Sequence, residues 1–72
     1  MASEARILEL AKRELGRDDL TLDTALEDAF ADSLEWLDFV TVMQTELGDL
    51  AVEKITAAES FRQLAEAYDL PN

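Results

Sequence analysis

The sequence contains neither cysteine nor histidine. Without cysteine the chain can form no disulfide framework and offers no thiolate nucleophile, a composition that fits a reducing cytoplasm. Without histidine it lacks the usual general base near neutral pH and the commonest metal ligand in proteins. We therefore expect no catalytic residue and no metal site.

Long hydrophobic runs are also missing. No apolar stretch approaches the length of a membrane-spanning helix, and residues 1–6 are polar and charged, unlike a secretory signal. The chain has 72 residues, 49% of them hydrophobic, which is enough to close one small core but leaves little room for an enclosed cleft. We expect a single domain over residues 1–72, monomeric and cytoplasmic, that does not insert into membranes and is not an enzyme.

Basic residues are absent from the middle of the chain. Between Arg17 and Lys54 there are eleven acidic residues and no lysine or arginine, and the net charge is −11. Such a field repels nucleic acid and anionic lipid, and it attracts basic protein surfaces. On charge alone, the simpler interpretation is that the acids keep a small domain soluble.

The spacing of apolar residues predicts helices over 3–15 and 33–47, a short helix over 51–55, and a last helix that opens with a capping box from Thr56 to Glu59. Gly16 and Gly48 are placed to end the first two. Residues 17–32 carry weaker periodicity and are expected to form an ordered loop that can include one short helical turn. Its apolar anchors are Leu20, Leu22, Leu26 and Phe30. The predicted fold is all-α: a small bundle of three main helices plus one short helix, with a long ordered loop between the first and second.

The helix over 33–47 has the strongest pattern. Asp32 is a good N-cap, and Glu35 at the third helical position completes an acidic version of the capping box. The residues expected to point inward are Leu34, Leu37, Val40, Met43 and Leu47, widened by Phe39 and Val42.

Ser33 follows the cap directly, where a hydroxyl is expected to lie exposed at the helix rim. The first N–H groups of a helix have no intrahelical partner and its dipole is positive there, so a phosphate attached at this point is favoured. The alternative is that Asp32 and Ser33 are an ordinary helix start, and for the isolated tripeptide that alternative is the stronger one.

The wider segment decides between these alternatives. Residues 32–40, which read Asp-Ser-Leu-Glu-Trp-Leu-Asp-Phe-Val, resemble the Asp-Ser-Leu segment of acyl carrier proteins. The similarity continues through Met43, Glu46 and Leu47 and through residues 53–56, and residues 61–66 resemble the peptidyl carrier relatives. It covers nearly the whole chain in order, length and charge.

The resemblance implies a site and a function. Ser33 would carry a covalent 4′-phosphopantetheine arm, Asp32 would help to position the serine, and Leu34, Glu35 and Asp38 would form the docking surface for partners. The arm would hold an acyl or aminoacyl thioester. Implied partners are a phosphopantetheinyl transferase, a loading ligase for acyl or aminoacyl groups, and downstream acyl-transferring enzymes with basic docking patches, but not nucleic acid.

Three departures from the family pattern point to a specialised carrier rather than the standard fatty-acid one. Phe30 stands where a glycine is usual, and the bulky ring can stiffen the loop or help to bury its end. The stretch between Leu47 and Lys54 is shorter, and Thr41 replaces a usual methionine. The pathway, whether of fatty acids, secondary lipids or polyketides, is left open.

Two further expectations concern apolar residues near Ser33. Trp36, the only tryptophan, is expected to pack as a half-buried structural residue, or else to line the acyl site or contact a partner. A long acyl chain is expected to lie between helices around Leu37, Met43 and Phe61.

The main alternative function is an unmodified acidic helical adaptor, a protein–protein interaction module, which fits composition and periodicity equally well. A calcium loop over residues 18–28 lacks the required spacing and glycine. A paired-carboxylate enzyme would need a cleft that a chain of this size has little room to build.

Overall fold

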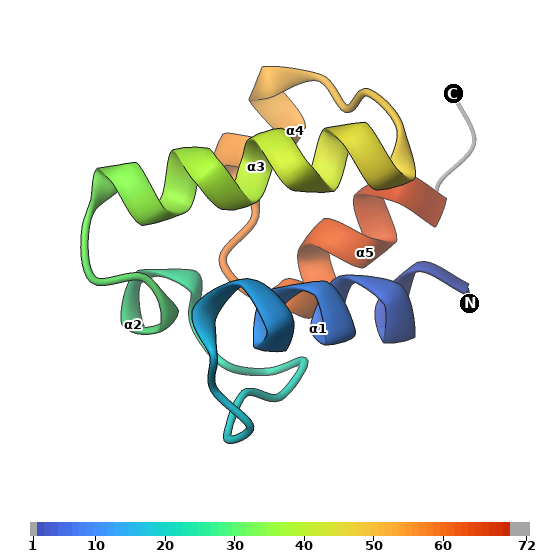
Figure 1. Ribbon diagram of the computed structural model, residues 1–72. Helices are drawn as coiled ribbons and strands as arrows, with labels where there is room; N and C mark the ends of the chain where they lie inside the picture. The colour runs from blue at the N-terminus through green and yellow to red at the C-terminus, as the bar shows by residue number, and fades with distance from the viewer. Residues whose placement is uncertain (1, 70–72) are drawn as a thin grey trace.

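The computed structural model describes residues 2–69 of the chain. They form five helices and no strand: α1 (Ala2–Leu15), α2 (Leu26–Ala29), α3 (Ser33–Leu47), α4 (Val52–Ala57) and α5 (Phe61–Asp69) (Figure 1). The predicted all-α fold is confirmed, with α1, α3 and α5 as the main helices, α4 as the short one and α2 as the helical turn in the long loop. Over the described range, no helix is long and apolar enough to cross a membrane.

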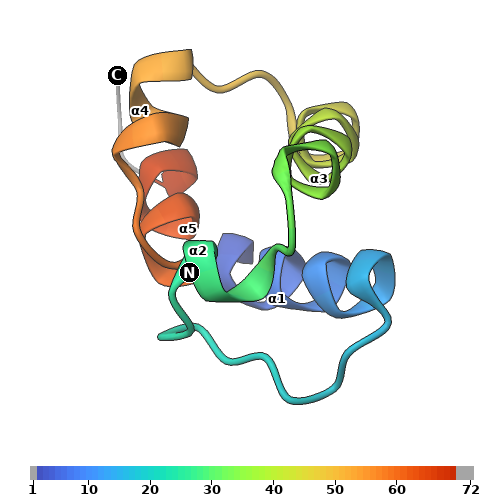
Figure 2. The ribbon, with the colours of Figure 1, turned by 90° about the vertical axis from the view of Figure 1, so that its left-hand side faces the viewer.

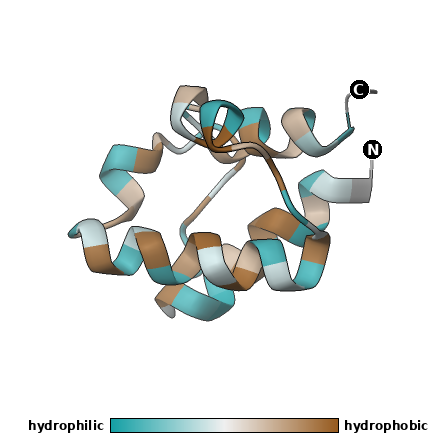
Figure 3. Cartoon of the chain, turned by 90° about the horizontal axis from the view of Figure 1, so that it is seen from above, coloured by the Kyte–Doolittle hydropathy of each residue, from teal (hydrophilic) through white to brown (hydrophobic). Residues whose placement is uncertain are grey.

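The main helices pack around α1, which contacts both α5 and α3. Figure 2 looks along the axis of α3 and shows α1 running across beneath it, with α4 and α5 on the opposite side and α2 at the near end. Hydrophobic residues recur along each helix between polar ones (Figure 3), as expected for short amphipathic helices that share one core.

The core lies where α1, α3 and α5 meet, and its most buried side chains come from all three: Ile7, Ala11, Phe39, Met43, Phe61, Leu64 and Ala65. Of the predicted loop anchors, Leu20, Leu26 and Phe30 are buried and Leu22 packs against the core from a partly buried position. The long loop is therefore ordered by apolar contacts, as predicted.

The inward face of α3 differs from the prediction. Leu34 and Leu37 do not point inward, because their exposed fractions are 71% and 56%. The observed stripe keeps five of the predicted residues and has Trp36 in place of Leu34 and Leu37. The rings of Trp36 and Phe39 both meet the ring of Phe30. The residues of α3 that pack into or against the core are Trp36, Phe39, Val40, Val42, Met43 and Leu47.

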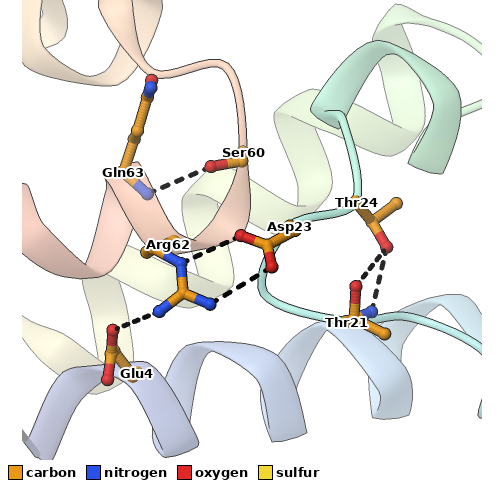
Figure 4. A network of polar contacts seen from close by, with 7 residues as sticks. All are labelled: Glu4, Thr21, Asp23, Thr24, Ser60, Arg62 and Gln63. Atoms are coloured by element: carbon orange, nitrogen blue, oxygen red, sulfur yellow. Dashed lines mark hydrogen bonds and ion pairs between the residues drawn. The ribbon is translucent and has the colours of Figure 1, made fainter.

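The start of the last helix also differs. Thr56 lies inside α4, where its hydroxyl donates to the carbonyl oxygen of Val52 at 3.0 Å, so it caps nothing. Ser60 takes that role instead: its Oγ accepts the N–H of Gln63 at 3.3 Å, at the first turn of α5 (Figure 4). The predicted capping box from Thr56 to Glu59 was wrong because α4 continues to Ala57 and uses Thr56 as an interior residue.

Both glycines end helices with positive φ angles, 64° at Gly16 and 107° at Gly48. Residues other than glycine rarely adopt this backbone conformation, so the two glycines fix where α1 and α3 end.

Candidate functional site

Ser33 is the first residue of α3, and Asp32 before it is the N-cap in an extended conformation. The Asp32 Oδ1 accepts the N–H of Glu35 at 3.0 Å, and the Asp32 carbonyl oxygen accepts the N–H of Trp36 at 3.3 Å. The predicted boundary at Ser33 and the predicted Asp32 N-cap are confirmed. The Glu35 side chain, predicted to complete a capping box, accepts the N–H of Ala31 instead of that of Asp32. The Ser33 side chain is exposed, and within residues 2–69 its hydroxyl has no hydrogen-bond partner.

The loop before Ser33 is anchored by an aromatic cluster. The Phe30 ring is buried, with its centroid 5.2 Å from that of Trp36, 5.3 Å from Phe39 and 6.1 Å from Phe61. These separations are within the range in which aromatic pairs stabilise each other. The ring at the position of the usual glycine therefore does bury the end of the loop, one of the two consequences expected for it.

Trp36 is half-buried and packs against the rings of Phe30 and Phe39, which confirms its structural role. It also lines a groove of about 280 Å³ that is open to solvent between α2, α3 and α4. The other lining residues are Leu26, Glu27, Phe30, Ile55, Thr56 and Ala58. Trp36 thus belongs both to the margin of the core and to this groove.

The expectation for a long acyl chain does not hold as stated. Met43 and Phe61 have no exposed surface, whereas Leu37 faces solvent on the outside of α3. These three side chains cannot line one cavity, because the same rotation of α3 that buries Met43 turns Leu37 outward.

The last residue of α2, which leads into the segment before Ser33, is held by Arg17, a contact that sequence reasoning missed. Its Nη1 donates to the carbonyl oxygen of Ala29 at 3.3 Å, while Nε and Nη2 donate to the Asp19 carboxylate at 3.1 and 2.9 Å. The hydrogen bond from Arg17 lowers the pKa of Asp19. The only signal in the sequence is that Arg17 is the last basic residue before the acidic stretch.

The three residues predicted to dock partners, Leu34, Glu35 and Asp38, are all exposed at the N-terminal end of α3. Leu37 is exposed beside them, although its helical spacing had predicted that it would point into the core. The carboxylate of Glu35 is already engaged, because its Oε1 accepts the N–H of Ala31 at 2.8 Å. The carboxylate of Asp38 has no hydrogen bond or ion pair with any described residue.

Away from Ser33, an arginine on α5 ties the long loop to the bundle (Figure 4). Arg62 Nε and Nη2 donate to the Asp23 carboxylate at 3.0 and 3.3 Å, and Nη1 donates to Glu4 on α1 at 3.3 Å. The backbone N–H of Arg62 also donates to the carbonyl oxygen of Leu22 at 2.9 Å. The Arg62 hydrogen bond lowers the pKa of Asp23.

Acidic side chains are numerous, but within the described part of the chain no three of them converge in a way that could hold a metal ion. Their arrangement is a distributed surface charge rather than a ligand cage.

A comparison with protein families completes the description of the site. The family model described as "Phosphopantetheine attachment site" matches residues 5–68, a range that includes the loop before Ser33 and all of α3. No curated protein and no solved structure matches the chain.

Proposed function

This chain belongs to the family of phosphopantetheine attachment domains, and we propose that Ser33 is the residue that carries the arm. Domains of this family are carriers that hold 4′-phosphopantetheine covalently and catalyse no reaction of their own. We propose further that the protein delivers an acyl or aminoacyl thioester to partner enzymes. The observation that carries the assignment of Ser33 is its exposed hydroxyl at the start of α3, which has no hydrogen-bond partner within residues 2–69.

The residues around Ser33 suit the attachment of a phosphate. The first N–H groups of a helix lack intrahelical partners, and together with the helix dipole they favour an anion at this end. Asp32 accepts the N–H of Glu35, which keeps the first turn of α3 closed while the Ser33 side chain stays in solvent. The hydroxyl oxygen of Ser33 would form the new bond to phosphorus and lose its proton, and the nucleotide half of coenzyme A would leave.

Once attached, the arm supplies a terminal thiol on which cargo is held as a thioester. The chain's own part is to present that arm on a surface that enzymes recognise. Tethering raises the concentration of the cargo at a docked partner without any new contact to the cargo itself.

We propose that partners dock on the outer face of α3 next to Ser33. Leu34 and Leu37 offer apolar area there, and Asp38 offers a carboxylate that has no ion-pair partner among the described residues. A fitting partner has an apolar hollow rimmed by lysine or arginine, and its association should be fast and weakened by salt. The proposed partners are a phosphopantetheinyl transferase, a loading ligase and downstream acyl-transferring enzymes.

We propose further that a short apolar cargo rests in the groove beside Trp36. Its volume of about 280 Å³ is near the lower limit for small-molecule sites, so it suits a small group rather than a long chain. Phe39, Met43 and Phe61 are almost completely buried, so a long chain would have to displace core side chains to enter between the helices.

The deciding experiment is incubation with coenzyme A and a transferase of broad specificity, followed by measurement of the intact mass. The wild type should gain the mass of one phosphopantetheine, Ser33→Ala should gain none, and Ser3→Ala should behave as the wild type. If the wild type gains nothing while a second carrier in the same mixture is modified, the proposal for Ser33 fails, and the unmodified acidic adaptor becomes the better description.

A further inference from the structure

Glu35 makes hydrogen bonds to two residues on the N-terminal side of Ser33, one through its N–H and one through its carboxylate. Its N–H donates to Asp32 Oδ1 at 3.0 Å, and its Oε1 accepts the N–H of Ala31 at 2.8 Å. The two bonds join the first turn of α3 to the last two residues of the loop, and Ser33 lies between the joined segments. A side chain expected to meet partners is thus also part of the internal framework of the site.

The start of α5 has the same arrangement with an uncharged residue in the place of Glu35. The Gln63 N–H donates to Ser60 Oγ at 3.3 Å, and Gln63 Oε1 accepts the N–H of Glu59 at 2.7 Å. The spacing is identical, since Gln63 and Glu35 each follow their N-cap by three residues. The chain itself shows that this pair of hydrogen bonds needs a side-chain oxygen but no negative charge.

The loop before Ser33 is held at neighbouring positions by three different side chains. Arg17 binds the Ala29 carbonyl oxygen, the Phe30 ring is buried in the aromatic cluster, and Glu35 binds the Ala31 N–H. Only the last of these contacts lies next to the N-cap. Loss of the Glu35 contact would free the N–H of Ala31 and loosen the entry to α3, while Phe30 kept the rest of the loop in place.

We infer that Glu35 is a positioning residue for Ser33, and that its part in loading is to hold residues 31–33 rather than to attract the transferase by charge. The inference rests on the proposed attachment at Ser33. The inference gives different roles to Glu35 and Asp38, the two acidic residues near Ser33 on α3. Glu35 acts through its hydrogen bond, and Asp38, which has no described partner, acts through its charge.

The test compares Glu35→Gln, Glu35→Ala and Asp38→Asn as substrates of a phosphopantetheinyl transferase. Glu35→Gln should keep kcat/KM within about twofold of the wild type, because an amide oxygen replaces the carboxylate oxygen. Glu35→Ala should lower it by roughly five- to tenfold, the factor expected for loss of one capping interaction. Asp38→Asn should act mainly by raising KM.

Ionic strength separates the two roles further. The difference between the wild type and Asp38→Asn should shrink as salt is added, because screening weakens the wild-type attraction itself. The difference between the wild type and Glu35→Ala should persist. A Glu35→Gln variant as slow as Glu35→Ala, with both defects fading in salt, would overturn the inference and make Glu35 a docking charge.

A readout without the transferase is hydrogen exchange of the Ala31 amide in the unmodified protein. Exchange should be faster in Glu35→Ala and unchanged in Glu35→Gln, with the Leu64 amide in α5 as the control for an intact core. Unchanged exchange at Ala31 in Glu35→Ala would contradict the inference. If Ser33 is not modified in the wild type, the proposed function fails, whereas the exchange result still decides whether Glu35 holds the loop.

Discussion

The ring of Phe30 meets the ring of Trp36 edge to face, with 5.2 Å between their centroids and 71° between their planes. One ring belongs to the loop before Ser33 and the other to the first turns of α3. Their contact couples the position of the loop to the helix that carries the site, and it does so at a place where the related carriers usually have a glycine.

Replacing Phe30 by alanine should destabilise the domain strongly. The ring is buried and contacts three other aromatic side chains, so its removal should lower the free energy of unfolding by about 3–5 kcal/mol. This is a large share of the total stability of so small a domain. Urea unfolding measures the effect, and Phe30→Leu is the matched control, with a much smaller loss. A Phe30→Ala midpoint equal to that of the wild type would show that the ring is not a structural anchor.

Trp36 should report whether cargo lies in the groove. It is the only tryptophan and lines the groove between α2, α3 and α4, so an apolar group seated there should shift its fluorescence to shorter wavelength. The comparison is between carriers loaded with a short apolar acyl group and with an acetyl group, at equal loading. Identical spectra for the two would place the cargo outside the groove.

Substitution of Leu37 should separate docking from stability. Because its side chain is 56% exposed, Leu37→Ser should change the free energy of unfolding by no more than about 0.5 kcal/mol. It should nevertheless raise the KM of a loading or transferring partner. Met43→Ala on the same helix is the buried control and should cost about 2–5 kcal/mol. Equal losses of stability in the two variants would mean that α3 is rotated from the position described.

The ion pair between Asp23 and Arg62 should make stability depend on pH. The hydrogen bond from Arg62 holds the pKa of Asp23 below its ordinary value of 3.8. A carboxylate with a depressed folded pKa stabilises the fold above its unfolded pKa, and the contribution disappears as the pH falls through the folded value. The wild type should therefore be more stable than Asp23→Asn at pH 7, and the two should converge below pH 3.8. Denaturant titrations at several pH values test this, and a constant difference would contradict it.

The sequence predicted both ends of α3 to the residue because each end has a local signal. Asp32 and Glu35 form a cap that depends on neighbours three residues apart, and Gly48 closes the helix with a backbone angle that favours glycine. Local rules of this kind can be read without knowledge of the tertiary fold.

The rotation of α3 could not be read in the same way. A stripe through Leu34 and Leu37 and a stripe through Trp36 and Phe39 both have helical spacing, and the choice between them is made by Phe30 in another segment. The bonds from Arg62 to Asp23 and from Arg17 to Ala29 were missed for a similar reason, since the partners lie 39 and 12 residues apart. A single sequence does not specify which distant residues form such pairs.

The internal arginine contacts shape the electrostatic potential of the molecule at long range. Arg13, Arg17 and Arg62 each bond an acidic side chain, and Arg6 donates to the carbonyl oxygen of Glu46. Seen from outside, an arginine joined to an acid is a dipole, whose potential decays faster than that of an isolated charge. Among the helices, α2, α3 and α4 together hold six acidic residues and one basic residue, Lys54, whereas the three acids of α1 are matched by three bases. The centre of negative charge is thereby displaced from the centre of mass toward α2, α3 and α4. In the field of a basic protein, this domain would experience a torque that turns these helices toward that protein before any contact forms.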